Sequence, residues 1–134
     1  PALRPASPTP LNEAIGPHRR FDWTAMPVAD LKAVKNAFGG TLNDVVLATV
    51  AGALRRFFIK RNLDPDELRI RSLVPVSVRA NGERGQMGNR VAEMIAELPV
   101  HVADPLDRLR IVSETMSDLK KGKRALGAEI MTQI

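Results

Sequence analysis

The stretch Gly39-Gly40-Thr41-Leu42-Asn43-Asp44 decides how the chain is expected to fold, because it ends one predicted helix and starts another. Two adjacent glycines are a strong helix stop, and they follow a short helix predicted over residues 30–38. Thr41 is a suitable N-cap, and Asp44 three positions later gives an acidic variant of the capping box. A long helix is therefore predicted from residue 41 to about residue 61.

The long helix is expected to bury one apolar stripe and to expose a basic end. The apolar residues that recur at helical spacing are Val46, Val50, Leu54, Phe57 and Phe58. The other side carries a basic cluster, placed where cations suit the helix dipole: Arg55, Arg56, Lys60 and Arg61. A solvated helix end is the favoured interpretation of this cluster. Docking on anionic lipid is the better of the two functional alternatives, and docking on nucleic acid is the other.

The N-terminal residues have the composition of a linker. Residues 1–10 contain four prolines, and we assign residues 1–18 to a Pro-rich, linker-like segment. Residues 19–26 alternate so that Phe21 and Trp23 share one face, which predicts a short strand. Trp23 is expected to anchor the core or a domain interface.

The second half of the chain predicts two antiparallel strands followed by a helix. The first strand covers residues 68–79, with Pro75 marking an edge, a bulge or a strand end. A loop rich in glycine and charge follows over residues 81–89, and the second strand covers residues 90–100. Asp104-Pro105 is a helix start, and the apolar residues at helical spacing up to Gly122 are Leu106, Leu109, Val112, Met116 and Leu119. Residues 124–134 are expected to begin another helix.

The predicted order β-α-α-β-β-α places the chain in the α/β class, as a mixed sheet with helices covering one face. One layer of helices on three strands is thin for an independent fold. The chain also starts at Pro1 without an initiator methionine and ends at Ile134 inside an amphipathic stretch. We therefore expect an internal piece of a longer protein, and an isolated piece that exposes an apolar face should form a homo-oligomer.

The composition narrows the classes of function. Hydrophobic residues make up 44% and charged residues 26% of the 134 residues, as in globular proteins. The chain has no cysteine and only two histidines, His18 and His101, both expected at the surface, so no metal and no cofactor is expected. No apolar run reaches the roughly 20 residues of a membrane span, and no signal peptide is visible, so a cytoplasmic setting is expected. The net charge of +5 favours anionic partners.

Four stretches, taken in order, resemble the bacterial wax ester synthase/diacylglycerol acyltransferase family. They are Pro10-Leu11-Asn12 with residues 15–21, Gly39 to Ala48, Val74 to Arg79, and Gly88 to Val91 leading to Leu98-Pro99-Val100. The resemblance implies a chloramphenicol-acetyltransferase-like fold, in which two similar halves face each other across a channel. Residues 19–134 would then be an incomplete C-terminal half-domain, with the N-terminal half of the same enzyme as its partner.

The resemblance also implies an activity, namely transfer of a fatty acyl group from acyl-CoA to diacylglycerol or a long-chain alcohol. The general base of the family is the second histidine of a His-His-x-x-x-Asp-Gly motif, which takes the hydroxyl proton of the acceptor. Neither His18 nor His101 has a neighbouring histidine or a suitably placed Asp-Gly. No catalytic residue is therefore expected in this chain, and the isolated chain is expected to be inactive.

Two groups of residues are candidates for a supporting role in that activity. Asn43 and Asp44 match the Asn-Asp motif of the family, and the favoured interpretation is structural, with Asp44 capping the helix and Asn43 in its first turn. Arg79, Asn89 and Arg90 flank the glycine-rich loop, as does Arg84. They are candidate contacts for the phosphates of CoA, against the alternative of an ordinary solvated loop.

Other functions remain open from the residues alone. One alternative is another acyltransferase or a condensation domain of the same fold. A second is a non-catalytic basic module that binds anionic lipid surfaces, consistent with a place at the inner membrane or on lipid droplets. Nucleic-acid binding has no support beyond charge, because the chain shows neither a helix-turn-helix signature nor an aromatic platform.

Overall fold

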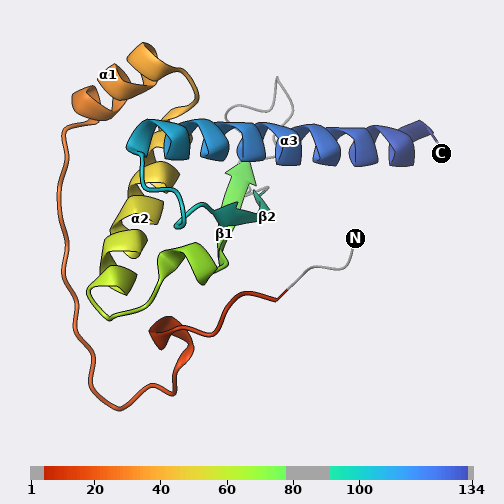
Figure 1. The fold of residues 1–134 in the computed structure, drawn as a ribbon. Helices are drawn as coiled ribbons and strands as arrows, with labels where there is room; N and C mark the ends of the chain where they lie inside the picture. The colour runs from red at the N-terminus through yellow and green to blue at the C-terminus, as the bar shows by residue number, and fades with distance from the viewer. Residues whose placement is uncertain (1–4, 78–90, 133–134) are drawn as a thin grey trace.

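The structure is a computed structural model that describes residues 5–77 and 91–132. It contains α1 (Val28–Phe38), α2 (Leu42–Ile59), β1 (Ile70–Ser77), β2 (Val91–Leu98) and α3 (Pro105–Thr132). Two short 3-10 turns cover Pro10–Asn12 and Pro65–Glu67. Figure 1 shows the start of α3 crossing over α2, with α1 beside this crossing and the small sheet next to α3. The predicted mixed α/β class is confirmed in this coarse form.

The corner between α1 and α2 follows the prediction, because both ends are fixed by local chemistry. Gly39 and Gly40 have φ angles of 84° and 83°, a backbone region that only glycine adopts without strain. The Thr41 hydroxyl accepts a hydrogen bond from the Asp44 amide, and the Asp44 carboxylate accepts one from the Thr41 amide, which completes the capping box. The predicted helices are therefore confirmed, with α1 beginning two residues earlier, at Val28 instead of Asp30.

The two described strands pair antiparallel, as predicted, from Ile70 opposite Leu98 to Ser77 opposite Val91. The register is continuous, and Pro75 lies opposite Glu93 without a bulge. Pro75 has no amide hydrogen to give to a strand. In the described part of the chain the sheet contains these two strands only, so the three-stranded prediction is wrong.

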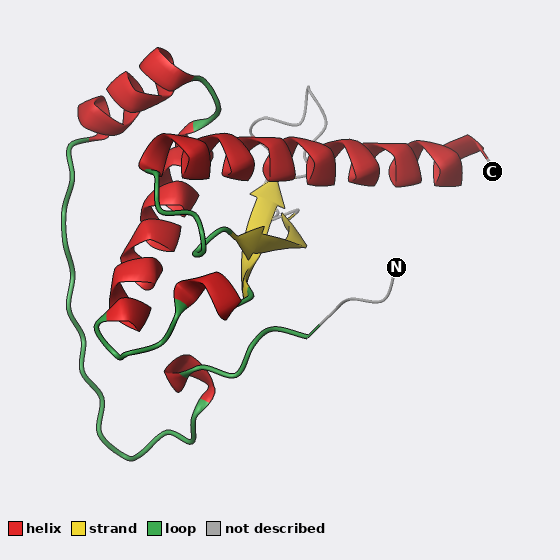
Figure 2. Cartoon of the chain, viewed as in Figure 1, coloured by secondary structure: helices red, strands yellow, loops and turns green. Residues whose placement is uncertain are grey.

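The strand predicted over residues 19–26 is wrong. Figure 2 shows this segment as part of a long loop that runs outside the helices. Phe21 and Trp23 stack on each other at 6.1 Å between ring centroids, yet they are 86% and 78% exposed. Alternation alone does not make a strand, because a strand requires a neighbour that accepts and donates its backbone hydrogen bonds. Trp23 is therefore not a core residue of this chain, and its predicted role at a domain interface stays a prediction.

The core lies between α2, α3 and the sheet, and the predicted stripe of α2 is confirmed only in part: Phe58 is buried, and Leu54 and Phe57 are partly buried against the core. Val46 and Val50 are 41% and 42% exposed, so their predicted burial is wrong. The buried residues of α2 are Asp44, Val45, Leu47, Ala48, Ala51 and Phe58. Small side chains on this face let α3 approach closely, so that Leu109, Val112 and Met116 pack over them as predicted.

Helix α3 is one continuous helix, so the predicted stop at Gly122 and the separate helix after it are wrong. A single glycine inside a helix costs only about 1 kcal/mol relative to alanine, which the surrounding helix can absorb. The predicted N-terminus of α3 is confirmed: the Asp104 carboxylate accepts hydrogen bonds from the amides of Leu106 and Asp107. Of the predicted stripe only Leu106 is largely exposed, at 49%.

Candidate functional site

Asp44, one of the two motif residues, is buried at the start of α2, where it joins that helix to α3. Its side chain is 3% exposed. Oδ2 accepts a hydrogen bond of 2.8 Å from the Thr41 amide and one of 3.3 Å from the hydroxyl of Ser113 on α3. Oδ1 is buried and has no hydrogen-bond partner within the described residues. An unpaired buried acceptor costs about 1–3 kcal/mol, so this oxygen is open to a further donor.

Gly40 completes this junction because it leaves room for Ser113. A Cβ atom at Gly40 would lie 2.5 Å from the Ser113 Oγ and 3.1 Å from the Asp44 Oδ2. The positive φ angle and this close approach both select glycine here. Asn43, the other motif residue, is exposed on the first turn of α2. The predicted capping by Asp44 and the predicted place of Asn43 in the first turn of α2 are therefore confirmed.

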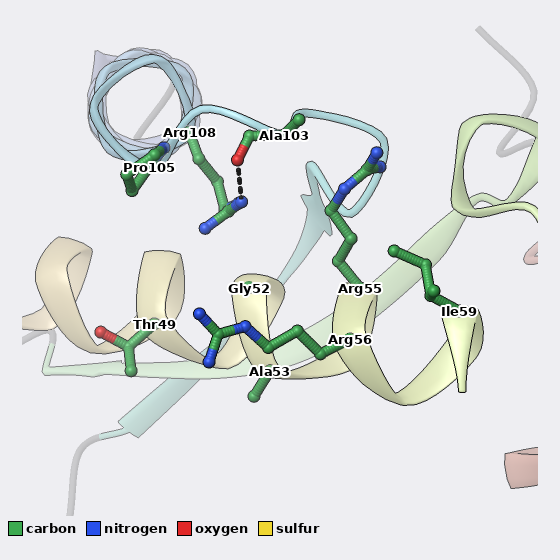
Figure 3. A pocket seen from close by; sticks show the side chains of 9 residues that line it. All are labelled: Thr49, Gly52, Ala53, Arg55, Arg56, Ile59, Ala103, Pro105 and Arg108. Carbon is green, nitrogen blue, oxygen red and sulfur yellow. Dashed lines mark hydrogen bonds between the residues drawn. The ribbon is translucent and has the colours of Figure 1, made fainter. Parts of the chain in front are cut away.

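A second feature is a cavity of about 430 Å3 between α2 and the start of α3, which we call the arginine pocket (Figure 3). Its lining includes Thr49, Arg55, Arg56, Ala103, Pro105 and Arg108. Figure 3 shows Arg108 entering from α3 and Arg56 lying along α2 toward Thr49. Their guanidinium groups face the same space, so the pocket can attract an anion.

Backbone carbonyls hold two of the three arginines in place. Arg55 Nη1 donates to the carbonyl oxygens of Val100 and His101 at 3.0 and 2.9 Å. It also pairs with the Asp66 carboxylate at 2.8 Å. Arg108 donates to the carbonyl oxygen of Val102 through Nε and Nη2 at 3.1 and 2.8 Å, and Nη2 also bonds to the Ala103 carbonyl. Arg55, one member of the predicted basic cluster, therefore has a structural role in holding residues 100 and 101, and Arg108 holds residues 102 and 103.

The electrostatics of the pocket follow from burial and like charge. Burial lowers the pKa of the Arg108 guanidinium below its ordinary value, and the neighbouring charge of Arg55 lowers it further. Asp104 opposes this pKa shift, while Arg56 adds to it. Arginine is so strongly basic that Arg108 still carries its charge at neutral pH. A ligand anion would relieve the repulsion among these groups.

Arg108 and Gly52 were not identified as site residues from the sequence, although helix periodicity places Arg108 on the buried face of α3. Arg108 lies four residues before Val112, so it shares the buried face of α3. A Cβ atom at Gly52 would lie 2.5 Å from the Arg108 Nη1, which explains why the side chain of Arg108 can lie across α2 at this point. The acceptors in residues 100–103 come from another segment, and helix periodicity does not reveal them.

A third feature is a cavity of about 340 Å3 enclosed by α1, α2 and the start of α3, which we call the apolar pocket. Its apolar lining includes Met26, Val34, Phe38, Ala48, Leu106 and Leu109. Thr49, Pro105 and Arg108 line both this cavity and the arginine pocket. The two cavities therefore adjoin each other at the start of α3.

Most of the remaining predicted site residues are not described by the structure. Arg79, Arg84, Asn89 and Arg90, with most of their loop, lie outside the described residues. His18 and His101 are exposed, as predicted. Arg61 packs over the ring of Phe57, with Cζ 4.4 Å from the ring centroid. Among residues 5–77 and 91–132, no group of three side chains has the composition and geometry to hold a metal ion.

Among the described helices, no single helix combines the length and apolarity needed to cross a membrane. Taken together, α1 and α2 meet those requirements, but they are bent by 100° at the break between them.

Comparison with known proteins gives two family matches and a set of mycobacterial relatives. The family model of the wax ester synthase/diacylglycerol acyltransferase catalytic domain matches residues 2–46, and that of the WS/DGAT C-terminal domain matches residues 87–134. A protein named probable diacylglycerol O-acyltransferase tgs1, from Mycobacterium tuberculosis, is 39% identical over 96% of this chain. A second, tgs2 from the same species, is 40% identical over 82% of the chain.

These relatives are much longer than the chain. The chain spans 28% of the length of the tgs1 protein and 24% of the length of the tgs2 protein. No solved structure matches the chain significantly. The two family matches lie in the same order as the four stretches noted above, and together they include Asn43, Asp44 and Ser113. The chain therefore belongs to the wax ester synthase/diacylglycerol acyltransferase family, and it carries segments that match both domains of that family.

Proposed function

We propose that the chain forms part of an O-acyltransferase that moves a fatty acyl group from acyl-CoA to diacylglycerol or a long-chain alcohol. The observation that carries this proposal is the pair of family matches at either end of the chain, supported by relatives named as diacylglycerol O-acyltransferases. In the reaction the hydroxyl oxygen of the acceptor attacks the thioester carbon, the hydroxyl proton passes to a base, and CoA leaves as the thiol after protonation.

This chain would support the reaction through the junction between its two family-matched segments. The hydrogen bond from Ser113 to Asp44 joins the segment that matches the catalytic domain to the segment that matches the C-terminal domain. Asp44 thereby fixes where α2 begins, and this placement orients the adjacent exposed Asn43. A rigidly held helix start is a suitable way to position a reacting group carried elsewhere in the protein. The catalytic base is proposed to come from a His-His-x-x-x-Asp-Gly motif outside this chain.

The finer architecture and the binding partners are part of the same proposal. Helices on one side of an antiparallel sheet are compatible with half of a chloramphenicol-acetyltransferase-like fold, whose other half would be the partner. Arg79, Asn89 and Arg90 are proposed to contact CoA phosphates, and acyl-CoA acts as substrate without a further cofactor. The exposed cations at the C-terminal end of α2, namely Arg56, Lys60 and Arg61, suit peripheral contact with the inner membrane or a lipid droplet from the cytoplasmic side.

The proposal is tested by acyl transfer from palmitoyl-CoA to hexadecanol and to diacylglycerol, using the longer protein that carries this chain. Asn43→Ala and Asp44→Ala should each lower the rate of acyl transfer. The isolated 134-residue chain should show no acyl transfer. The matched controls are Asn36→Ala and Asp22→Ala, which change the same residue types at exposed positions. If the longer protein transfers no acyl group to any alcohol, the proposal fails.

One further variant separates a positioning role of Asp44 from a role of its charge. In Asp44→Asn the amide oxygen can keep both hydrogen bonds that Oδ2 now accepts, from Thr41 and Ser113. A positioning role therefore predicts that this variant retains most of the activity, with KM unchanged. Loss of kcat to the level of Asp44→Ala would show that the negative charge itself takes part.

A further inference from the structure

The arginine pocket and the apolar pocket share lining residues. A positively charged cavity and an apolar cavity therefore lie next to each other. Thr49, Pro105 and Arg108 line both cavities. Arg108 is 8% exposed, so its aliphatic stem lies among apolar neighbours while its guanidinium reaches the arginine pocket. A molecule that extends across these shared residues would meet positive charge at one end and hydrocarbon at the other.

The arginine pocket carries an excess of positive charge that is not neutralised within it. Asp66 pairs with Arg55 and is 64% exposed on its side chain. Arg56 makes no ion pair and no side-chain hydrogen bond with any residue in the described part of the chain. Because carbonyl groups already fix Arg108, little conformational freedom of this side chain is lost when an anion binds between Arg56 and Arg108.

The apolar pocket gathers large side chains that the fold leaves exposed. Met26, Val34, Phe38 and Leu106 all line it, and all four remain exposed to solvent. Contiguous apolar surface of this kind marks a binding site, because monomeric proteins seldom leave it uncovered. The charge next to it argues for an amphiphile as the occupant, since a purely apolar partner would leave the guanidinium groups uncompensated.

We propose that the two pockets together bind one single-chain amphiphile, with its anionic head between Arg56 and Arg108 and its hydrocarbon chain in the apolar pocket. A carboxylate or a phosphate head satisfies the same guanidinium donors. This binding does not depend on acyl transfer, and Asn43 lines neither pocket.

The head group is tested by titrating the 134-residue chain with dodecyl phosphate below its critical micelle concentration and measuring the heat of binding. Arg56→Gln should weaken binding about tenfold, as expected when one charge-assisted contact is lost. The matched control Arg61→Gln removes the same charge from the same end of α2, but Arg61 lies over Phe57 and outside the pocket. It should leave the affinity unchanged. Both arginines are exposed, so neither change should affect folding.

The hydrocarbon chain is tested with a second matched pair. Leu106→Gln should weaken the binding of dodecyl phosphate about fivefold, because part of the apolar leucine side chain that covers the alkyl chain is lost. Leu73→Gln is the control, since Leu73 is 57% exposed on β1 and does not line the apolar pocket. Inorganic phosphate and dodecyltrimethylammonium should each bind at least tenfold more weakly than dodecyl phosphate.

The two matched pairs decide the outcome together. Equal losses for Arg56→Gln and Arg61→Gln, or for Leu106→Gln and Leu73→Gln, would overturn the proposal in favour of unspecific adsorption. Displacement of dodecyl phosphate by laurate identifies a free anionic lipid as the natural source, and displacement by lauroyl-CoA identifies an acyl chain linked to a nucleotide. Displacement by neither compound overturns it as well.

Discussion

The sharpest prediction concerns Gly40, because two separable effects oppose a side chain there. In Gly40→Ala the φ angle of 83° costs about 1–3 kcal/mol for a residue with a Cβ atom. The new Cβ would also lie 2.5 Å from the Ser113 Oγ, and relieving that overlap costs about another 1–3 kcal/mol. The variant should therefore lose about 2–6 kcal/mol of unfolding free energy, a large part of the stability of a small domain.

A double-mutant cycle separates the two effects. Ser113→Ala alone removes a hydrogen bond of 3.3 Å to Asp44 and should cost about 1 kcal/mol. In the Gly40→Ala background the same change removes the overlapping oxygen, so it should restore about 1–3 kcal/mol instead. The assay is urea unfolding followed by circular dichroism at 222 nm, which reports α1, α2 and α3.

Gly39 supplies the control for this cycle. It also has a positive φ angle, but a Cβ atom there would meet nothing within 4 Å. Gly39→Ala should destabilise the chain, yet its effect and that of Ser113→Ala should add to within about 0.5 kcal/mol. Additivity in the Gly40 cycle, or equal coupling in both cycles, would refute the close approach of Gly40 to Ser113.

Changes at two positions, followed by the same unfolding assay, and one measurement on the unmodified chain test other parts of the fold. Thr41→Ala should cost about 0.5–2 kcal/mol because the cap on the Asp44 amide is lost, and Thr41→Ser should restore most of it. Gly122→Ala should raise the unfolding free energy by up to about 1 kcal/mol if α3 is continuous, and no gain would indicate a break there. The unmodified chain should sediment as a dimer or larger, since Val46 and Val50 leave apolar surface exposed, and a monomer would contradict this.

The sequence predicted those parts of the fold that depend on neighbours in the chain. Helix ends are determined by backbone groups within about one turn. This holds for the two glycines between α1 and α2, for the Thr41 cap, and for the start of α3 at Asp104-Pro105. Antiparallel pairing of β1 and β2 also follows from two apolar runs joined by a short connection. These local signals predict where helices and strands begin and end, because they do not depend on which other segments pack against those elements.

The wrong predictions concern features that depend on contacts with a distant segment of the chain. On α2 the β-branched Val46 and Val50 suggested the buried face, but α3 packs on the side of Ala48 and Ala51, where the two helices can come closer. Residues 19–26 have the alternation of a strand and no strand beside them, so the segment stays a loop. The arginine pocket was missed for the same reason, because the carbonyls that hold Arg55 come from residues 100–101.

The start of α2 combines two reversals of the usual pattern, and both occur within three residues of each other. Asp44 is buried with one oxygen unpaired, while Val46 is exposed. The unpaired oxygen of Asp44 costs stability, since burial penalises unpaired polar groups. Natural proteins keep such costs mainly at functional sites. These reversals coincide with the Asn-Asp motif and with the contact between the two family-matched segments, and they therefore support the proposed positioning role of Asp44 and Ser113.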